Sequence, residues 1–155
     1  MKQSVCMATT PPKRRLSDMQ KLRERVEPRL EPGERLIGAF VAQAGPRTYD
    51  RIPWLGPFIL IKWVRELRHR GERRMWVTIA VTDRSVTIFE NENKRFSAGS
   101  GFKRPNRLLR RYDERTVLGK TGESLGDDWI EVDGKRYWVS DVWLDEARRL
   151  SRLIS

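Results

Sequence analysis

Short runs in which apolar and polar positions alternate recur along much of the chain, and this period of two is typical of antiparallel β-structure. The runs are rich in β-branched and aromatic residues, which strands favour. Asp83 and Arg84 separate two of the runs, and Asp133-Gly134-Lys135 separates two others, with an Asp-Gly pair that is a strong signal for a tight hairpin turn. The predicted strands are residues 35–43, 75–82, 85–89, 115–118, 129–132 and 136–139. The pattern therefore predicts a mainly β domain built from hairpins.

Two stretches have the period of an α-helix instead. In residues 16–27, Ser17 and Gln20 have the spacing of a capping box, and the following Pro28 disfavours helix at the residue before it. Residues 141–154 predict an amphipathic helix with acidic residues early and arginines late, as the helix dipole favours. The apolar stripes are Met19, Leu22 and Val26 in the first helix and Trp143, Ala147, Leu150 and Ile154 in the second. We expect the second stripe to close one end of the sheet.

The longest apolar segment comprises residues 52–64 and is surrounded by arginine-rich sequence. Gly56 and Pro57 break it, Lys62 interrupts it, and the segment is too short to span a hydrocarbon core of roughly 30 Å as a helix. Two interpretations stay open: the segment is buried in the protein, or it lies in a membrane interface with its tryptophans at head-group depth. The candidate membrane-interface residues are Trp54, Leu55, Phe58, Lys62, Trp63, Arg65, Arg68 and Arg70.

The chain has 155 residues and a formal net charge of +11. Its length is that of one domain with a proper core. Residues 1–15 are predicted to be a disordered polar leader, and residues 16–155 are predicted to form a single domain. The positive charge is concentrated in residues 1–120, whereas residues 121–155 are mildly acidic. Such a field attracts nucleic acid or anionic lipid, although a soluble protein rich in arginine would show the same composition.

Residues 103–111 form a second basic segment, which we predict to be a loop or an irregular helix. Cations spaced in this way could follow a phosphate backbone, and Phe102 or Tyr112 could stack on a base. Binding of this kind would be independent of sequence and would weaken steeply with salt. The candidate polyanion-binding residues are Lys103, Arg104, Arg107, Arg110 and Arg111. A solvated basic loop without a ligand would have the same composition.

Reactive residue types are too few for the common catalytic and metal sites. Cys6 and His69 are the single cysteine and the single histidine, so a structural zinc site lacks ligands and a Ser–His–acid triad has no support. Gly119-Lys120-Thr121 resembles the end of a phosphate-binding loop, but Glu114 occupies the position of the required earlier glycine. We therefore predict a protein that is not an enzyme and that uses no metal and no cofactor.

Three short motifs precede the C-terminal helix that contains Trp143. In chain order they are Leu30-Glu31-Pro32-Gly33-Glu34, Pro53-Trp54-Leu55-Gly56 and Val81-Thr82-Asp83-Arg84. In this order the chain resembles a group of small bacterial pleckstrin-homology-like (PH-like) proteins, most of which have no defined function. The resemblance covers residues 30–154 and implies a bent antiparallel barrel capped by the C-terminal helix, with a non-catalytic binding role. Residues 103–111 have no counterpart in that pattern.

We therefore expect a non-catalytic basic binding or adaptor module that associates with an anionic membrane surface. We predict a cytoplasmic protein that is peripheral at the inner face of the membrane, because the chain has a lone cysteine and its leader has no apolar run of signal-peptide length. One alternative is sequence-nonspecific nucleic-acid binding through residues 103–111. Another is a protein–protein interaction domain in which residues 16–27 dock a partner through Met19 and Leu22. The sequence leaves the oligomeric state open.

Overall fold

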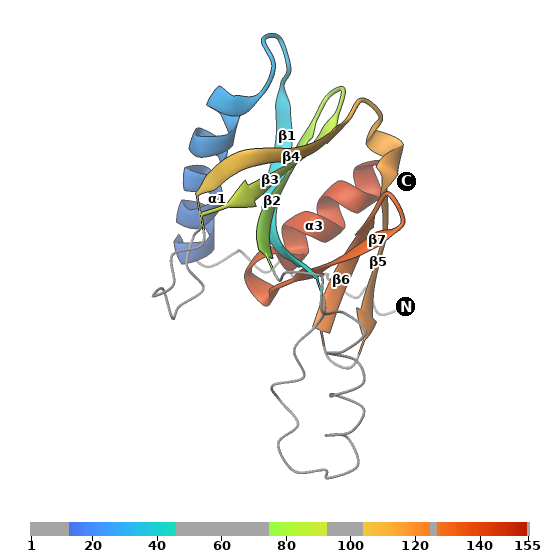
Figure 1. The fold of residues 1–155 in the computed structure, drawn as a ribbon. Helices are drawn as coiled ribbons and strands as arrows, with labels where there is room; N and C mark the ends of the chain where they lie inside the picture. Colours follow the sequence, from blue (N-terminus) through green and yellow to red (C-terminus); the bar gives the residue numbers. More distant parts are fainter. Residues whose placement is uncertain (1–12, 46–74, 93–103, 125–126, 155) are drawn as a thin grey trace, which may run out of the picture.

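The computed structural model describes residues 13–45, 75–92, 104–124 and 127–154, which form a seven-stranded antiparallel sheet and two helices (Figure 1). The strands are β1 (Leu36–Ala44), β2 (Met75–Thr82), β3 (Val86–Asn91), β4 (Pro105–Tyr112), β5 (Leu118–Ser124), β6 (Asp127–Val132) and β7 (Lys135–Val139). The helices are α1 (Lys13–Val26) and α3 (Asp141–Ile154), and the short 3₁₀ helices are η1 (Glu27–Arg29) and η2 (Arg115–Val117). The described part of the chain is mainly β, as the alternating pattern predicts.

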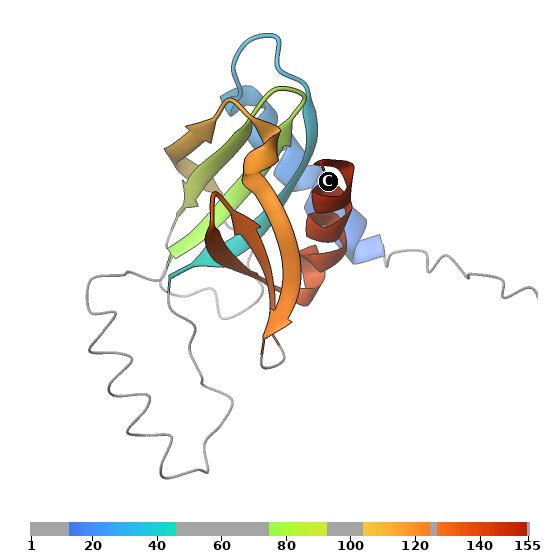
Figure 2. The same ribbon diagram turned by 90° about the vertical axis from the view of Figure 1, so that its right-hand side faces the viewer.

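Neighbouring strands follow the order β4-β3-β2-β1-β7-β6-β5, so β1 lies at the centre of the sheet. From β1 the sheet continues as one meander through β2 to β4 and as a second meander back through β7 to β5. The sheet is bent, and in Figure 2 β5 passes in front of β2 and β3. Within the described residues β4 and β5 are the two edges and do not pair with each other. The sheet is therefore open, and the barrel predicted from the sequence is not closed by hydrogen bonds.

Both predicted hairpins are present, and the backbone of each turn is held in the way that its residues favour. In the β2–β3 turn the hydroxyl of Thr82 accepts hydrogen bonds from the backbone N–H groups of Arg84 (3.2 Å) and Ser85 (2.8 Å). In the β6–β7 turn Asp133 and Gly134 have φ angles of 51° and 71°. Left-handed conformations at both central residues are those of a type I′ turn, whose twist matches the flanking strands. The Asp-Gly signal is thus confirmed.

Both faces of β1 are buried, and each is covered by a different helix. Gly38 lets α3 approach closely, because a Cβ at this position would lie 2.7 Å from a guanidinium nitrogen of Arg149 and 3.0 Å from Cδ2 of Leu150. Phe40 and Ala42 continue the same face and are fully buried. The helix α1 also contacts β1, and Figure 1 shows the two helices on opposite sides of this strand. The central strand therefore connects two halves of the core.

The helix α1 begins at Lys13, three residues before the predicted start. Ser17 consequently lies inside the helix and cannot form the predicted cap at its N-terminus. The helix ends at Val26, and Pro28 lies in η1, directly beyond the end. Leu22 and Val26 are fully buried. Leu22 is therefore part of the domain's own core rather than an exposed residue of a docking surface.

The helix α3 has the predicted bounds and the predicted apolar face. Trp143, Ala147 and Leu150 are buried, and Ile154 is half-buried. The helix contacts β1, β5, β6 and β7. At its start the backbone N–H of Trp143 donates a hydrogen bond to the carbonyl of Ser140 (2.9 Å). The prediction that this stripe packs against the sheet is confirmed.

Two segments differ from the prediction. Residues 103–111 were predicted as a loop or an irregular helix, but residues 105–112 form β4, and its pairing with β3 shifts register at Leu109. Residues 115–118, predicted as a strand, are mostly η2, and β5 begins at Leu118. Both strands lie at an edge of the sheet, where a strand pairs on one side only and often carries charged residues. Their sequences therefore lack the apolar alternation that marks a central strand.

Candidate functional site

The candidate membrane-interface residues, Trp54, Leu55, Phe58, Lys62, Trp63, Arg65, Arg68 and Arg70, lie outside the described residues, and so does Lys103. Their roles stay predictions from the sequence. The structure does place the residues that flank this segment in the chain. Ala44, at the end of β1, pairs with Met75, at the start of β2, and Gly45 follows β1 directly. Residues 46–74 therefore leave and rejoin the sheet at adjacent points.

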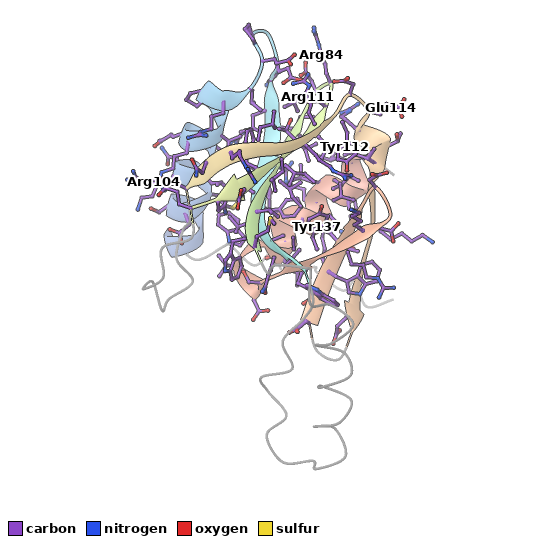
Figure 3. The ribbon with its side chains drawn as sticks, in the orientation of Figure 1. Arg84, Arg104, Arg111, Tyr112, Glu114 and Tyr137 are labelled. Carbon is purple, nitrogen blue, oxygen red and sulfur yellow. The ribbon has the colours of Figure 1, made fainter. Side chains whose placement is uncertain are left out.

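The remaining polyanion candidates lie on or next to β4, and Figure 3 shows Arg104 and Arg111 toward opposite ends of this strand. Arg104 is exposed. Arg107 forms an ion pair with Glu90 (2.9 Å), and the Arg110 guanidinium lies 3.7 Å from the carboxylate of Asp133. The strand is therefore not a continuous row of free cations. This compensation weakens the support for nucleic-acid binding by the segment, which stays a prediction.

Arg111 belongs to a partly buried ionic network. Its guanidinium donates hydrogen bonds of 2.9 and 3.1 Å to Glu34 and also contacts Glu31 and Asp113. The side chain of Glu34 is only 3% exposed and accepts a further hydrogen bond from the hydroxyl of Ser85 (2.8 Å). Burial is the largest single influence on the pKa of Glu34 and acts to raise it, but the hydrogen bonds from Ser85 and Arg111 and the charge of Arg111 together lower the pKa. Arg111 therefore has a structural role.

Side chains bridge the open side of the sheet between β4 and the β6–β7 turn. The hydroxyl of Tyr112 donates a hydrogen bond to the carboxylate of Asp133 (3.1 Å) and accepts one from Arg110 (3.2 Å). Tyr112 and Tyr137 come from the two sides of this opening and are both labelled in Figure 3. The two halves of the bent sheet are therefore linked here by polar side chains, although their backbones do not pair.

A cavity of about 590 Å³ opens between the two halves of the sheet. Ligand pockets in proteins are typically about 300–1,000 Å³ and mostly apolar, with a few polar groups. The lining residues are Ala44, Gly45, Met75, Val77, Ile88, Leu109, Arg110, Lys135, Arg136 and Tyr137. Gly45 and Met75, which flank residues 46–74, both belong to this lining. The cavity therefore has the size of a small-molecule site, with polar and apolar surface in similar shares, and it lies where residues 46–74 join the sheet.

The polar part of the lining is basic. Arg110, Lys135 and Arg136 contribute to it, and none of the lining residues that the structure describes is acidic. Lys135 and Arg136 are exposed, and the guanidinium of Arg136 stacks over the ring of Trp129, 4.3 Å from its centroid. The Arg136 guanidinium therefore lies on the face that carries Trp129, beside the cavity and not inside it. Arg110, Lys135 and Arg136 are called the basic rim below. A cavity that combines an apolar lining with a basic rim suits a ligand with an apolar part and an anionic group.

Tyr137 contributes a polar group to the wall of the cavity. The residue is 8% exposed, and burial is the main cause of its raised pKa, with the nearby Tyr112 also raising it. A phenol whose pKa lies above the usual value of about 10 stays protonated at neutral pH. Its hydroxyl can therefore donate a hydrogen bond to an acceptor in the cavity.

Comparison of the chain with protein-family models, with curated proteins and with solved structures finds no match. In the described ranges, no group of three or more His, Cys, Asp or Glu side chains is arranged to hold a metal ion. Neither α1 nor α3, the two α-helices of these ranges, is long and apolar enough to cross a membrane. The chemistry of the site therefore has to be inferred from its own lining.

A row of aromatic side chains crosses the opposite face of the sheet. The strand registers pair Trp76 with Gln43, Gln43 with Trp138, Trp138 with Trp129, and Trp129 with Gly122. Residues directly opposite each other on neighbouring strands share a face, so these tryptophans share one face of the sheet. Each of the three is half-buried. Tyr137 precedes Trp138 in β7 and therefore points to the other face, into the cavity.

Arg110 is a candidate predicted from the sequence, whereas Lys135, Arg136 and Tyr137 were not predicted as site residues. Lys135 was predicted as part of the Asp-Gly turn, and Arg136 and Tyr137 as the start of the strand after it. Two cations directly beside a two-residue turn were a usable signal, because a hairpin end is exposed and can present charge to a ligand. The apolar lining had no such signal, since Val77 and Ile88 look like ordinary core residues of a hairpin.

Proposed function

We propose that the protein is a non-catalytic, PH-like binding module that associates with an anionic membrane surface. The order of its elements supports the PH-like assignment, because two antiparallel meanders meet at β1 and a single C-terminal helix follows them. Two motifs of the resemblance also meet in space. The hydroxyl of Thr82 donates a hydrogen bond to Glu34 (3.3 Å), and the backbone N–H of Arg35 donates one to the carboxylate of Asp83 (3.0 Å).

One observation carries the membrane proposal. The basic rim lines the same cavity as Gly45 and Met75, the residues from which the chain enters and leaves residues 46–74. That segment contains the apolar residues 52–64 and the cations that follow them in the sequence. Chain connectivity therefore brings the attachment points of an apolar, tryptophan-containing segment together with a cationic surface. Peripheral membrane proteins combine these two features when they bind anionic lipids.

The two features would contribute comparable free energies. A cation close to an anionic leaflet adds about 1 kcal/mol of attraction. An apolar side chain such as Leu55 or Phe58 adds roughly 1.5–3 kcal/mol when it becomes fully buried in the bilayer interface. Three rim cations and a few apolar side chains are then enough for reversible association, and neither feature would be sufficient alone at physiological ionic strength.

The combined substitution Lys135→Gln and Arg136→Gln tests the contribution of the rim. We expect the wild-type protein to sediment at low salt with vesicles of phosphatidylcholine and phosphatidylglycerol in equal amounts, and not with phosphatidylcholine alone. Loss of two cations at about 1 kcal/mol each predicts binding to the anionic vesicles that is weaker by about thirtyfold. Both side chains are exposed, so the substitutions should leave the fold intact.

The matched control is Lys21→Gln with Arg84→Gln, which removes the same charge elsewhere. Lys21 is exposed on α1, and Figure 3 shows Arg84 in the β2–β3 turn, far from Tyr137. We expect this variant to bind the anionic vesicles within about threefold of the wild type, since most of the attraction falls off within a Debye length of roughly 10 Å. A wild-type protein that fails to sediment would overturn the proposal. Equal losses in both variants would show that net charge alone drives binding, and the rim would then have no specific role.

A further inference from the structure

We infer that the cavity binds the apolar chain of a single-chain anionic amphiphile, with the anionic head group held by Arg110 and Lys135. The inference deepens the proposed function, because it assigns a ligand class to the cavity at the proposed membrane-binding site. It differs from surface association in one respect. A bilayer needs only to touch the rim, whereas this ligand places its chain inside the protein.

The lining determines the apolar half of the ligand. Met75, Val77, Ile88 and Leu109 project from three neighbouring strands, and Ala44 completes the apolar lining at the end of β1. Val77 and Ile88 are at most 2% exposed, so the apolar surface continues inward from the mouth into the core. A volume of about 590 Å³ lies within the range of small-molecule sites and is far smaller than a bilayer patch would require. One extended alkyl chain fits this description.

The charge of the rim determines the anionic half. Arg110 and Lys135 line the cavity, and none of the described lining residues is acidic. The Arg110 guanidinium lies 3.7 Å from the carboxylate of Asp133, which is outside the described lining. Asp133 also accepts the hydrogen bond from Tyr112, so its charge is shared between two donors. A carboxylate or phosphate at the mouth would therefore meet Lys135, which forms no ion pair within the described residues, and Arg110, whose charge Asp133 compensates only in part. A cationic head group at the same position would meet only like charges.

Tyr137 supports the placement of the head group near the mouth. It adjoins Arg136 in β7 and lines the cavity, and its neutral hydroxyl can donate a hydrogen bond to a carboxylate or phosphate oxygen. Guanidinium groups bind such oxygens with strong, charge-assisted hydrogen bonds. Polar groups at the mouth and apolar groups further in would orient an amphiphile with its head outward.

Isothermal titration calorimetry with dodecanoate, below its critical micelle concentration, tests the inference. We expect the wild-type protein to bind dodecanoate at a single site, and acetate or dodecyltrimethylammonium at least tenfold more weakly. Dodecyl phosphate should bind like dodecanoate, because the rim recognises either anion. Ala44→Phe, which fills the cavity from the end of β1, should weaken dodecanoate binding at least tenfold. Ala44→Leu provides a smaller change if the phenylalanine variant fails to fold, as judged by circular dichroism.

The charge variants complete the test. Arg110→Gln with Lys135→Gln should weaken dodecanoate binding at least tenfold, whereas Lys21→Gln with Arg84→Gln should leave it unchanged. The inference is wrong if dodecanoate does not bind, or if the cationic amphiphile binds equally well. Vesicle sedimentation separates the two proposals. Vesicle binding without dodecanoate binding overturns only the cavity assignment, and dodecanoate binding without vesicle binding overturns only the membrane function. In a folded Ala44→Phe protein we expect loss of dodecanoate binding with vesicle binding retained.

Discussion

Glu34 connects three segments that are distant in the sequence. Its backbone N–H donates to the carbonyl of Glu31 (3.1 Å), which closes the turn before β1. Its carboxylate accepts hydrogen bonds from Ser85 in the β2–β3 turn and from Arg111 near the end of β4. A buried carboxylate is costly unless its oxygens are satisfied by donors or by an opposite charge. The donors around Glu34 therefore make its burial possible, and the carboxylate in turn holds the three segments together.

Replacing Glu34 by glutamine should destabilise the protein in a pH-dependent way. Loss of hydrogen bonds to a charged group predicts a free energy of unfolding that is lower by about 2 kcal/mol at pH 7. Because the pKa of Glu34 is lower in the folded state, its carboxylate stabilises the fold above the unfolded pKa of about 4.3, and this contribution is lost as the pH falls further toward the folded value. Urea unfolding of wild type and variant from pH 7 to pH 3 should show the difference shrinking below about pH 4.3.

Glu31→Gln is the matched control for this prediction. Glu31 also contacts the Arg111 guanidinium, at 3.1 Å, but its side chain is 64% exposed. An exposed ion pair contributes about 0–1 kcal/mol, so this variant should unfold close to the wild type at every pH. If both variants lose the same stability, burial is not what distinguishes the two carboxylates. A difference that stays constant from pH 7 to pH 3 would contradict the lowered pKa of Glu34.

At the scale of elements, the sequence predicted the hairpins and the helix that local sequence signals define. The β2–β3 and β6–β7 hairpins have β-branched or aromatic runs on both sides of polar turns, and α3 has an apolar stripe of helical period. The edge strands were missed because their signals are not local. The β4 sequence, Pro105 to Tyr112, has three arginines and one asparagine, and it is a strand because β3 pairs with it. Two glycines within β5 equally disfavour strand on propensity alone.

Gly122 in β5 has a reason to be glycine that only the assembled sheet reveals. A Cβ at this position would lie 2.7 Å from Cε2 and 3.0 Å from Cη2 of Trp129, so the indole would have to move. Overpacking of this kind costs roughly 1–3 kcal/mol. We expect Gly122→Ala to lower the free energy of unfolding by that amount and to change the near-ultraviolet circular dichroism of the tryptophans, because Trp129 also stacks with Arg136.

Gly119→Ala provides a comparison within the same strand. A Cβ at Gly119 would be 3.4 Å from its nearest neighbour, the Cβ of Glu131, which is an ordinary contact. The stability of this variant should therefore stay within about 0.5 kcal/mol of the wild type. Equal effects of the two substitutions in chemical unfolding would point to backbone flexibility in β5 and would remove the special role assigned to the Trp129 contact.

At the scale of the whole molecule, the cavity could not have been predicted from the sequence. Its lining comes from the end of β1 and from β2, β3, β4 and β7, and these residues become neighbours only because the sheet bends. The basic composition was visible, but its distribution was not. Arg107 and Arg111 are paired with carboxylates, whereas Lys135 and Arg136, which were not predicted as binding residues, line the cavity. Net charge therefore predicted attraction to polyanions but not its location.

The six tryptophans of the chain allow the membrane-facing side of the molecule to be identified. Trp54 and Trp63 belong to the segment that joins the sheet at the cavity, whereas Trp129 and Trp138 belong to the row on the opposite face. Lipids with brominated acyl chains quench the fluorescence of tryptophans that enter the bilayer. Indole rings favour the membrane interface, where their amphipathic character is accommodated. Anionic vesicles containing brominated lipid should therefore quench the wild-type protein through Trp54 and Trp63.

Two double variants with equal tryptophan content provide the comparison. Quenching should largely disappear in Trp54→Phe with Trp63→Phe, and it should persist in Trp129→Phe with Trp138→Phe. The opposite pattern would place the membrane on the aromatic row, and Arg110 and Lys135 would then face away from the lipid. Vesicles without phosphatidylglycerol should give no quenching in any variant, because the rim needs an anionic surface for the initial attraction. Quenching by uncharged vesicles would show that apolar insertion alone anchors the protein.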